Sequence, residues 1–356
     1  MSRFLSGRFS VFDAYVPGEQ PSDMEYIKLN TNESPYPPPD AVIDIVKKEA
    51  GKLNLYPNPD GTKLIMKLAD FYNVKPDNVI IGNGSDELLA FSFLAFFENG
   101  VVFPDITYGF YPVYAQLYGV VYNQIPLHDD LTINIKDYIG IDKNIMIANP
   151  NAPTGIALGI DDIEAIVKSN PDHIVIIDEA YVDFGGITAI PLIHKYDNLL
   201  VIHTYSKSRS LACARLGYAI GSAPVIEDLN KMKYSFNPYN VNSLTQVMGA
   251  AALDEEPYYI EKRQEIIETR KYTKDHLIKL GFIMTNSCAN FLFCKHPDID
   301  GFKLYSELKK RGILIRQWNK PRISDYIRIT IGTKKQMYAL IGAVEDVTKI
   351  TGKVWS

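Results

Sequence analysis

The sequence predicts an α/β protein with two domains. The large domain has a mainly parallel sheet flanked by helices, and a smaller α+β domain lies at the C-terminus. Between residues 40 and 250, short apolar strands alternate with helical segments. These strands are continuously apolar, which is typical of strands buried on both faces of a parallel sheet. After residue 253 the pattern changes to a long charged helix and a strand of period two. We therefore expect an N-terminal arm over residues 1–28, a large domain over 29–250 and a small domain over 251–356.

The elements of the large domain follow from apolar runs separated by Gly, Pro, Asn and Asp. Helices are expected over residues 40–53 and 62–73, and strands over 79–81, 101–103, 145–148, 174–177 and 199–202. The strongly apolar run at 88–97 is shorter than the ~20 residues of a membrane span, so it predicts a buried helix. Polar residues follow the strand ends, where an α/β sheet places its ligand site.

The small domain is expected to begin with a charged helix over residues 258–280, followed by strands over 289–294 and 326–331. In the second strand, Ile327, Ile329 and Ile331 fall on one face, and Arg328 and Thr330 on the other. This alternation indicates a half-buried strand of an antiparallel sheet. The side chain of Arg328 is therefore expected to point away from the isoleucines.

Composition and charge argue against several classes of protein. The 356 residues include 37 Lys and Arg against 42 Asp and Glu, a net charge of −5, so the chain lacks the basic excess typical of nucleic-acid binding. The first 15 residues contain no apolar signal core. The three cysteines form no CxxC pair, and the six histidines form no HxH or HExxH motif. We expect a cytoplasmic protein without a metal site, a nucleic-acid partner or a membrane anchor.

The segment Gly-Asn-Gly-Ser-Asp-Glu at residues 82–87 lies between a predicted strand and an apolar helix. Free N–H groups at a helix N-terminus, together with the helix dipole, suit a phosphate group. The alternative is a plain helix cap with acidic residues in the first turn. A dinucleotide fingerprint would need a third glycine where Glu87 stands. Asp86 and Glu87 would repel a phosphate unless their side chains point away.

A second segment, 173–181, is an apolar strand that ends in Asp178 and Glu179. It is similar to a Walker B strand, but the chain has no GxxxxGK[ST] motif, so an ATPase is not expected. A carboxylate at the end of a buried strand needs a cationic partner. The alternative is a helix cap or a structural ion pair.

A third segment, 203–217, places Lys207, Arg209 and Arg215 and several hydroxyl groups directly after an apolar strand. Such a cluster binds an anion, and a desolvated lysine beside an arginine can serve as an amine nucleophile. The alternative is a solvated basic turn.

Taken together, these segments resemble the fold-type I pyridoxal-phosphate aminotransferases. Ser206-Lys207, followed by Arg215-Leu-Gly, is similar to the lysine segment of that family. Asp-Glu-Ala-Tyr at 178–181 and Asn-Pro-Asn-Ala-Pro-Thr-Gly at 149–155 are similar to two further signatures in the same order. Segments 15–21, 29–35, 55–59, 107–111 and 328–332 resemble the histidinol-phosphate aminotransferase branch. The resemblance runs from about residue 12 to the C-terminal helix.

The resemblance implies a cofactor, pyridoxal 5′-phosphate, and roles for the residues around it. Lys207 would hold the cofactor covalently and then move a proton at the substrate. Asp178 would pair with the pyridine nitrogen, which gives this carboxylate its cationic partner. Tyr181 would bond to the 3-oxygen of the ring, and Tyr108 would stack on its face, although Tyr108 could equally be a core aromatic.

The family also implies residues around the phosphate of the cofactor and a contact from a second subunit. The matching positions here are Gly84, Ser85, Asp86, Thr204, Ser206 and Arg215. Tyr56, in Leu-Tyr-Pro-Asn-Pro, resembles a phosphate contact that the second subunit donates. The resemblance therefore implies a homodimer with shared active sites.

The sequence departs from the family pattern at two positions. The family usually has Asn directly before Pro-Thr-Gly, where this chain has Ala152, so Asn151 is the candidate replacement as a cofactor contact. Arg316 is followed by Gln317-Trp318 where the family usually has Asp, which affects the substrate contacts more than the cofactor. The substrate-binding positions that the resemblance implies are Tyr15, Asn32, Arg316 and Arg328.

The reaction implied by the resemblance is transamination between histidinol phosphate and 2-oxoglutarate, giving imidazole acetol phosphate and glutamate, a step of histidine biosynthesis. A threonine-phosphate decarboxylase and an aromatic amino acid aminotransferase are alternatives on the same fold. A guanidinium group can pair with either a carboxylate or a phosphate through two N–H donors. Arg328 is thus the expected common anchor of both substrates, the alternative being a structural ion pair with an acidic neighbour.

Overall fold

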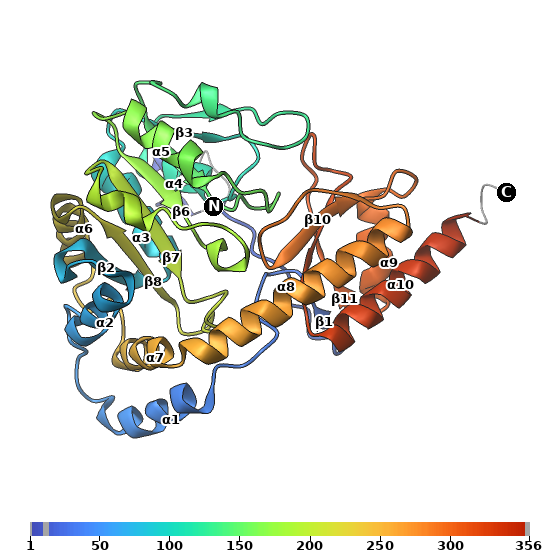
Figure 1. Ribbon diagram of the computed structural model, residues 1–356, viewed down its shortest axis with the longest axis horizontal. Helices are drawn as coiled ribbons and strands as arrows, with labels where there is room; N and C mark the ends of the chain where they lie inside the picture. Colours follow the sequence, from blue (N-terminus) through green and yellow to red (C-terminus); the bar gives the residue numbers. More distant parts are fainter. Residues whose placement is uncertain (1, 10–13, 353–356) are drawn as a thin grey trace.

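The computed structural model describes residues 2–9 and 14–352, which form two lobes (Figure 1). In the larger lobe a seven-stranded sheet has the order β2-β8-β7-β6-β5-β3-β4. Its strands are β2 (Val79–Asn83), β3 (Val101–Pro104), β4 (Tyr122–Ile125), β5 (Asn144–Ala148), β6 (Val175–Asp178), β7 (Leu199–Thr204) and β8 (Leu216–Gly221). Neighbouring strands from β7 to β4 pair in parallel, whereas β8 is antiparallel to both β2 and β7. The mainly parallel sheet predicted from the sequence is confirmed.

The five strands predicted for this lobe correspond to β2, β3, β5, β6 and β7, while β4 and β8 have no counterpart in the prediction. Glycines interrupt the apolar run of β8. At Gly217 a Cβ atom would lie 2.3 Å from the backbone nitrogen of Ser85, so a side chain there would displace the start of the following helix. The same glycine that allows this close approach thus weakens the sequence signal for the strand.

Helices cover both faces of the large sheet. They are α1 (Asp40–Glu49), α2 (Thr62–Tyr72), α3 (Ser85–Phe96), α4 (Tyr111–Tyr118), α5 (Ile160–Ser169), α6 (Ala223–Phe236) and α7 (Ser243–Asp254). Side chains alternate along each strand: Val79 and Ile81 of β2 pack in the core beneath α1, α2, α5 and α7, and Ile80 packs in the core beneath α3, α4 and α6. Burial on both faces explains why these strands are continuously apolar.

The smaller lobe contains an antiparallel sheet of order β12-β13-β10-β9. Its strands are β9 (Ile283–Met284), β10 (Phe291–Lys295), β12 (Arg316–Gln317) and β13 (Ile327–Thr330), and its helices are α9 (Gly301–Lys310) and α10 (Lys334–Gly352). Ile327, Ile329 and Ile331 are buried in one core, as their alternation predicts. Strand β1 (Ile27–Lys28), in the segment expected to be an arm, pairs in parallel with β11 (Ile313–Leu314) of this lobe.

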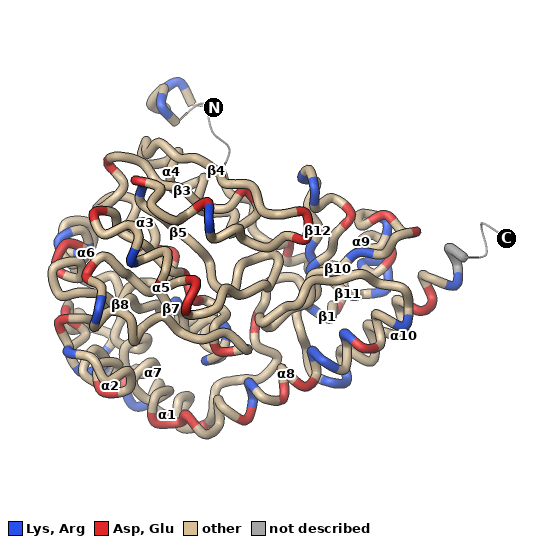
Figure 2. The backbone as a smooth tube through the Cα atoms, turned by 45° about the horizontal axis from the view of Figure 1, so that its top comes forward, with Lys and Arg blue, Asp and Glu red and all other residues tan. Residues whose placement is uncertain are grey.

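Helix α8 (Glu256–Lys279) runs from one lobe to the other, as Figure 1 shows. Tyr259 near its start packs in the core of the large lobe, and Ile266 and Leu277 further along pack in the core of the small lobe. Acidic and basic residues are interspersed over both lobes (Figure 2). Within the described part of the chain, no helix combines the length and apolar character of a membrane span.

Candidate active site

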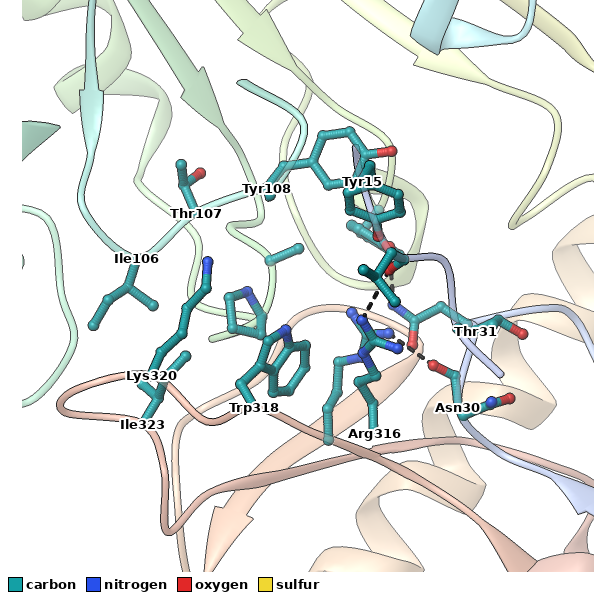
Figure 3. A pocket seen from close by; sticks show the side chains of 18 of the residues that line it. Tyr15, Asn30, Thr31, Ile106, Thr107, Tyr108, Arg316, Trp318, Lys320 and Ile323 are labelled. Carbon is teal, nitrogen blue, oxygen red and sulfur yellow. Dashed lines mark hydrogen bonds between the residues drawn. The ribbon is translucent and has the colours of Figure 1, made fainter. Parts of the chain in front are cut away.

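Two adjoining cavities lie next to the carboxyl ends of the parallel strands. The inner cavity, of about 450 Å³, is walled by the last residues of β5, β6 and β7, which are Ala148, Asp178 and Thr204. The outer cavity, of about 550 Å³, lies between the lobes and is shown in Figure 3. The residues lining both cavities are Thr31, Tyr108, Ala152, Tyr181 and Lys207. The amine of Lys207 thus stands at the junction of the two spaces.

Lys207 follows β7, and its position is fixed by contacts to the segment after β1. Its Nζ donates a hydrogen bond of 3.2 Å to the carbonyl oxygen of Thr31 and lies 5.9 Å from the ring centre of Tyr181. The amide of Asn32 donates a hydrogen bond of 2.9 Å to the hydroxyl of Tyr181. Asn32 has a positive φ of 57°, and its backbone N–H donates to the hydroxyl of Thr330 at 3.0 Å. The hydrogen bond to Thr330 holds Asn32 in an uncommon backbone conformation. Asn32 in turn fixes the position of the Tyr181 hydroxyl.

Asp178 ends β6 with its side chain buried, 5% exposed, at the inner cavity. The hydroxyl of Tyr111 donates a hydrogen bond of 2.9 Å to Oδ2, and the backbone N–H of Ala180 donates one of 3.2 Å to Oδ1. Burial raises the pKa of Asp178 to about 6, and these two hydrogen bonds oppose that rise. Among residues 2–9 and 14–349, none forms an ion pair with this carboxylate. It is a buried acid that lacks a cation on the cavity side.

The other end of the inner cavity is formed by the N-terminus of α3, which Gly84 directly precedes. This glycine has a φ of +78°, and a Cβ there would lie 2.5 Å from Nη2 of Arg215, so a larger residue would displace the guanidinium. Asp86 accepts hydrogen bonds from Arg215 (2.9 Å) and from the hydroxyl of Tyr108 (2.8 Å). The side chain of Glu87 turns away and accepts from the backbone N–H of Asn83 at 2.6 Å. The repulsion that the sequence suggested is therefore reduced for Glu87 and offset by Arg215 for Asp86.

Two hydroxyl groups, at the end of β7 and just after it, complete this end of the cavity. Thr204 donates a hydrogen bond of 2.9 Å from its hydroxyl to that of Ser206, and the backbone N–H of Ser206 donates to Thr204 at 3.1 Å. Both residues line the inner cavity together with Ser85 and Arg215. Helix-terminal N–H groups, hydroxyls and a guanidinium form a set of donors suited to a phosphate group.

Two arginines of the small lobe face the outer cavity. The Nη2 of Arg328 donates to the carbonyl oxygen of Asn30 at 2.9 Å, and its guanidinium lies 5.3 Å from the ring centres of Phe291 and Trp318. Burial, together with the charge of Arg316, lowers the pKa of Arg328. In the part of the chain that the structure describes, no carboxylate pairs with either arginine. The structural ion pair considered from the sequence is thus not formed.

The arm before β1 covers these arginines. Arg316 donates to the carbonyl oxygens of Val16 and Pro17 at 3.3 and 3.4 Å. The ring of Tyr15 packs against Phe110 with 4.2 Å between the ring centres. Tyr15, Asn32, Arg316 and Arg328, the four predicted substrate positions, all line the outer cavity.

Three predicted cofactor residues lie outside the linings of both cavities. Gly84 stands behind Arg215. The side chain of Asn151 is buried and bonds to the carbonyl oxygen of Ile106 at 2.9 Å and to the hydroxyls of Thr107 (2.8 Å) and Thr154 (3.1 Å), so it ties two loops together. Its neighbour Ala152 faces both cavities instead. Tyr56 is 81% exposed on the surface and stacks on Tyr239 at 4.6 Å.

The sequence reasoning missed Tyr111, which bonds to Asp178. Tyr111 lies at the start of a buried helix, and a tyrosine in that position is ordinarily a core residue. Lys320 was also missed, since a single lysine in a loop carries no pattern. Within the described residues, no group of His, Cys, Asp and Glu is arranged to bind a metal ion.

Comparison with known proteins identifies the family. The sequence model of one protein family, aminotransferase class I and II, matches residues 24–344. The chain belongs to this aminotransferase family. Among its relatives, the histidinol-phosphate aminotransferase of Lactococcus lactis subsp. lactis (strain IL1403) is 49% identical over 338 residues, 94% of each chain. That of Brachyspira hyodysenteriae is 47% identical over 353 residues, 98% of this chain and 100% of the relative.

Solved aminotransferase structures have the same fold. The histidinol-phosphate aminotransferase from Sinorhizobium meliloti, in complex with pyridoxal-5′-phosphate, superposes with a TM-score of 0.90 at 22% identity over 98% of both chains. The enzyme from Clostridium acetobutylicum superposes with a TM-score of 0.84 at 25% identity, over 90% of this chain and 99% of that chain. The fold predicted from the sequence, that of the fold-type I aminotransferases, is confirmed.

The inner cavity of this aminotransferase fits pyridoxal 5′-phosphate. That molecule has a phosphate at one end, a ring nitrogen that can carry a proton, and an aldehyde that reacts with a lysine. The cavity offers phosphate donors at the N-terminus of α3, a buried carboxylate without a cation at Asp178, and the amine of Lys207. Asp178, which has no cationic partner, decides the fit, because a protonated ring nitrogen supplies the positive charge that it lacks.

Proposed function

We propose that this aminotransferase transfers the amino group between histidinol phosphate and 2-oxoglutarate, giving imidazole acetol phosphate and glutamate, a step of histidine biosynthesis. The observation that carries the proposal is the pair Arg316 and Arg328. Both face the outer cavity, which also reaches Lys207, and no carboxylate of the described chain forms an ion pair with either of them. Such a site takes an anionic amino compound. The relatives that match over nearly the whole chain act on the phosphate ester that their names state.

In this proposal the residues of the inner cavity hold pyridoxal 5′-phosphate. Lys207 would bind it covalently, Asp178 would pair with its ring nitrogen, and Tyr181 would form a hydrogen bond to its 3-oxygen. When bound, the cofactor supplies an electron-withdrawing ring that stabilises negative charge at the carbon bearing the amino group. Tyr108 covers one wall of the ring site. The phosphate is bound by the N-terminus of α3 at Ser85 and Asp86 and by Thr204, Ser206 and Arg215.

Lys207 would also move the proton during the transfer, once the amino group of the substrate has displaced its amine from the cofactor. Its amine is the basic group at the junction of the two cavities. It can therefore take a proton from the substrate carbon that bears the amino group and return it on the other side of the amino nitrogen. The carbonyl oxygen of Thr31, at 3.2 Å, orients this amine through a hydrogen bond. Asn32 keeps the hydroxyl of Tyr181 oriented towards the ring site.

Arg328 and Arg316 bind the anionic group of either substrate. For glutamate this group is the α-carboxylate, and for histidinol phosphate it is the phosphate, which lies on the equivalent side of the reacting carbon. Trp318 and Phe291 lie beside the guanidinium of Arg328, and their ring faces favour a cation there. Tyr15 closes the cavity from the arm.

We also propose a homodimer in the cytoplasm. Tyr56 is too exposed to be a core residue and stacks on Tyr239, and further apolar side chains are exposed in the segment after α1 and at and just after the end of α6. They are Leu53, Leu55, Phe236 and Tyr239. An apolar surface of this kind favours contact with a second subunit, whose site Tyr56 would complete. The cysteines of the described chain are unpaired, which is consistent with a reducing compartment.

One assay separates this function from the alternatives. The holoenzyme is incubated with 2-oxoglutarate and either histidinol phosphate, tyrosine or threonine phosphate, and glutamate and carbon dioxide are measured. We expect glutamate from histidinol phosphate at the highest kcat/KM, and no carbon dioxide from threonine phosphate. The solved threonine-phosphate decarboxylase from Porphyromonas gingivalis shares the fold at 19% identity. Release of carbon dioxide, or a higher kcat/KM with tyrosine, would contradict the proposal.

A further inference from the structure

The outer cavity carries more positive charge than one anion requires. Its charged lining residues are Lys207, Arg316, Lys320, Arg322, Arg328 and the single acid Asp105. Asp105 pairs with Arg322 at 2.8 Å, and Arg322 also donates to the carbonyl oxygens of Leu127 and His128. This pair is therefore neutral and already bonded. Lys207 is used at the reacting carbon, and the other two arginines bind one anion.

Lys320 is the cation that remains. It lies in the loop between β12 and β13, and its ammonium group has no hydrogen bond or ion pair with any other residue of the ranges 2–9 and 14–349. In Figure 3 its side chain extends past Ile106 towards Thr107, on the opposite side of Trp318 from Arg316. The ring of Trp318 lies 5.8 Å from the guanidinium of Arg316, and in the view of Figure 3 it separates that guanidinium from the side chain of Lys320.

Two positive ends match a substrate with two negative ends. Histidinol phosphate has one anionic group, whereas glutamate and 2-oxoglutarate each have two carboxylates. The cavity has an apolar wall that includes Ile106, Trp318 and Ile323, and a substrate with one carboxylate on the arginines would extend its second carboxylate along this wall. A carboxylate next to apolar side chains is costly unless a cation or a hydrogen-bond donor compensates for the lost water.

We propose that Lys320 binds the side-chain carboxylate of the dicarboxylic amino donor and of its 2-oxo acid. The inference rests on the proposed function and assigns a residue to the second substrate. A lysine suits this role because its ammonium group lies on a long flexible stem with three donors. It can approach a carboxylate and can turn to solvent when an uncharged imidazole takes the same place, since Lys320 is exposed.

The test compares glutamate with norvaline, in which a methyl group replaces the side-chain carboxylate. Single-turnover rates of the half-reaction are measured against donor concentration with the pyridoxal-phosphate holoenzyme for wild type, Lys320→Met and Lys320→Arg. The initial slope gives the kcat/KM of that half-reaction for each donor. Lys303→Met is the matched control, because Lys303 lies on α9 outside both cavities. We expect Lys320→Met to lower the preference for glutamate over norvaline about tenfold, as for the loss of a hydrogen-bonded charge. Lys320→Arg should restore most of it, and Lys303→Met should not alter it.

Three results would overturn the assignment. The wild type could fail to prefer glutamate to norvaline. Lys320→Met could leave that preference unaltered, or it could lower kcat/KM equally for both donors. A parallel arm with histidinol phosphate separates this inference from the proposed function. If the wild type fails to convert histidinol phosphate, the proposed function is wrong, while the comparison of glutamate with norvaline still tests Lys320. If it converts histidinol phosphate and the preference is unaltered, the inference alone is wrong.

Discussion

The hydroxyl of Tyr111 donates a hydrogen bond of 2.9 Å to Oδ2 of Asp178, and both side chains are buried. Tyr111 is the first residue of α4, whereas Asp178 is the last residue of β6. The helix therefore sets the direction of the carboxylate at the inner cavity. Because this bond stabilises the charged form, it also opposes the rise in pKa that burial causes at Asp178.

The first prediction concerns this bond. Tyr111→Phe should leave the fold intact and lower kcat about tenfold or more, since a hydrogen bond to a charged group contributes about 1.5–3 kcal/mol. It should also shift the pH at which the absorption band of the bound cofactor changes. Tyr114→Phe is the matched control, because Tyr114 lies one turn further along the same helix and is also buried. Equal kcat values and equal spectral pH profiles for the two variants would show that Tyr111 acts as a packing residue.

The second prediction concerns the protein after removal of the cofactor. The pKa of Asp178 is about 6 in the folded protein against an ordinary 3.8. The folded state therefore holds this proton more tightly than the unfolded chain, so the free energy of unfolding falls as pH rises from about 4 to about 6. The fall due to Asp178 is on the order of 3 kcal/mol.

Urea unfolding of the cofactor-free protein at several pH values measures this fall. Asp178→Asn should show a clearly smaller dependence on pH in that window, because the amide does not titrate. The same substitution should lower kcat on the order of 10³-fold, about 4 kcal/mol, since it no longer keeps the ring nitrogen protonated. Identical pH profiles for the two cofactor-free proteins would contradict the raised pKa.

How far the sequence predicts this site can be seen by comparing Asp178 with Tyr111. Asp178 was predictable because a carboxylate at the end of a continuously apolar strand is chemically unusual. Tyr111 was not, because its hydroxyl has a partner that is 67 residues away and is reached only through the fold. The same reason applies to Asn151, whose adjacency to the family position suggested a cofactor contact. Its amide is instead used by the loops around residues 106, 107 and 154.

The fold was predictable to the extent that burial leaves a pattern in the chain. Strands β5, β6 and β7 are buried on both faces and give uninterrupted apolar runs. Edge strand β4 is half exposed and polar, so it gives no such run. The pairing of β1 with β11 was not predictable either, since two residues in each strand are too few for a periodic signal.

The third prediction concerns the two arginines. Arg328→Lys should weaken both half-reactions about tenfold or more, because an ammonium group cannot make the paired N–H contacts of a guanidinium. Arg316→Lys should weaken the reaction with histidinol phosphate more than that with glutamate. Arg311→Lys, on a pair with Glu307 outside both cavities, is the control. Single-turnover rates with each amino donor measure the effect. A loss confined to one donor in Arg328→Lys would rule out a common anion anchor.

The fourth prediction concerns Tyr56 and the proposed dimer. If Tyr56→Phe alone is clearly impaired, mixing it with inactive Lys207→Ala should recover activity after subunit exchange. In a shared site, the mixed dimer has one site with both defects and one site with neither. Activity should approach that of one intact site per mixed dimer. Confirmed exchange without recovery would mean that each site takes both residues from one subunit.

Transamination by this protein depends above all on the amine of Lys207, at the junction of the two cavities. The most direct test is to reduce the holoenzyme with borohydride, which fixes the cofactor to the amine that holds it, and to locate the modified lysine by mass spectrometry. We expect modification at Lys207, and neither modification nor transamination of histidinol phosphate in Lys207→Ala. Attachment of the cofactor to a different lysine, or turnover by Lys207→Ala close to that of the wild type, would contradict it.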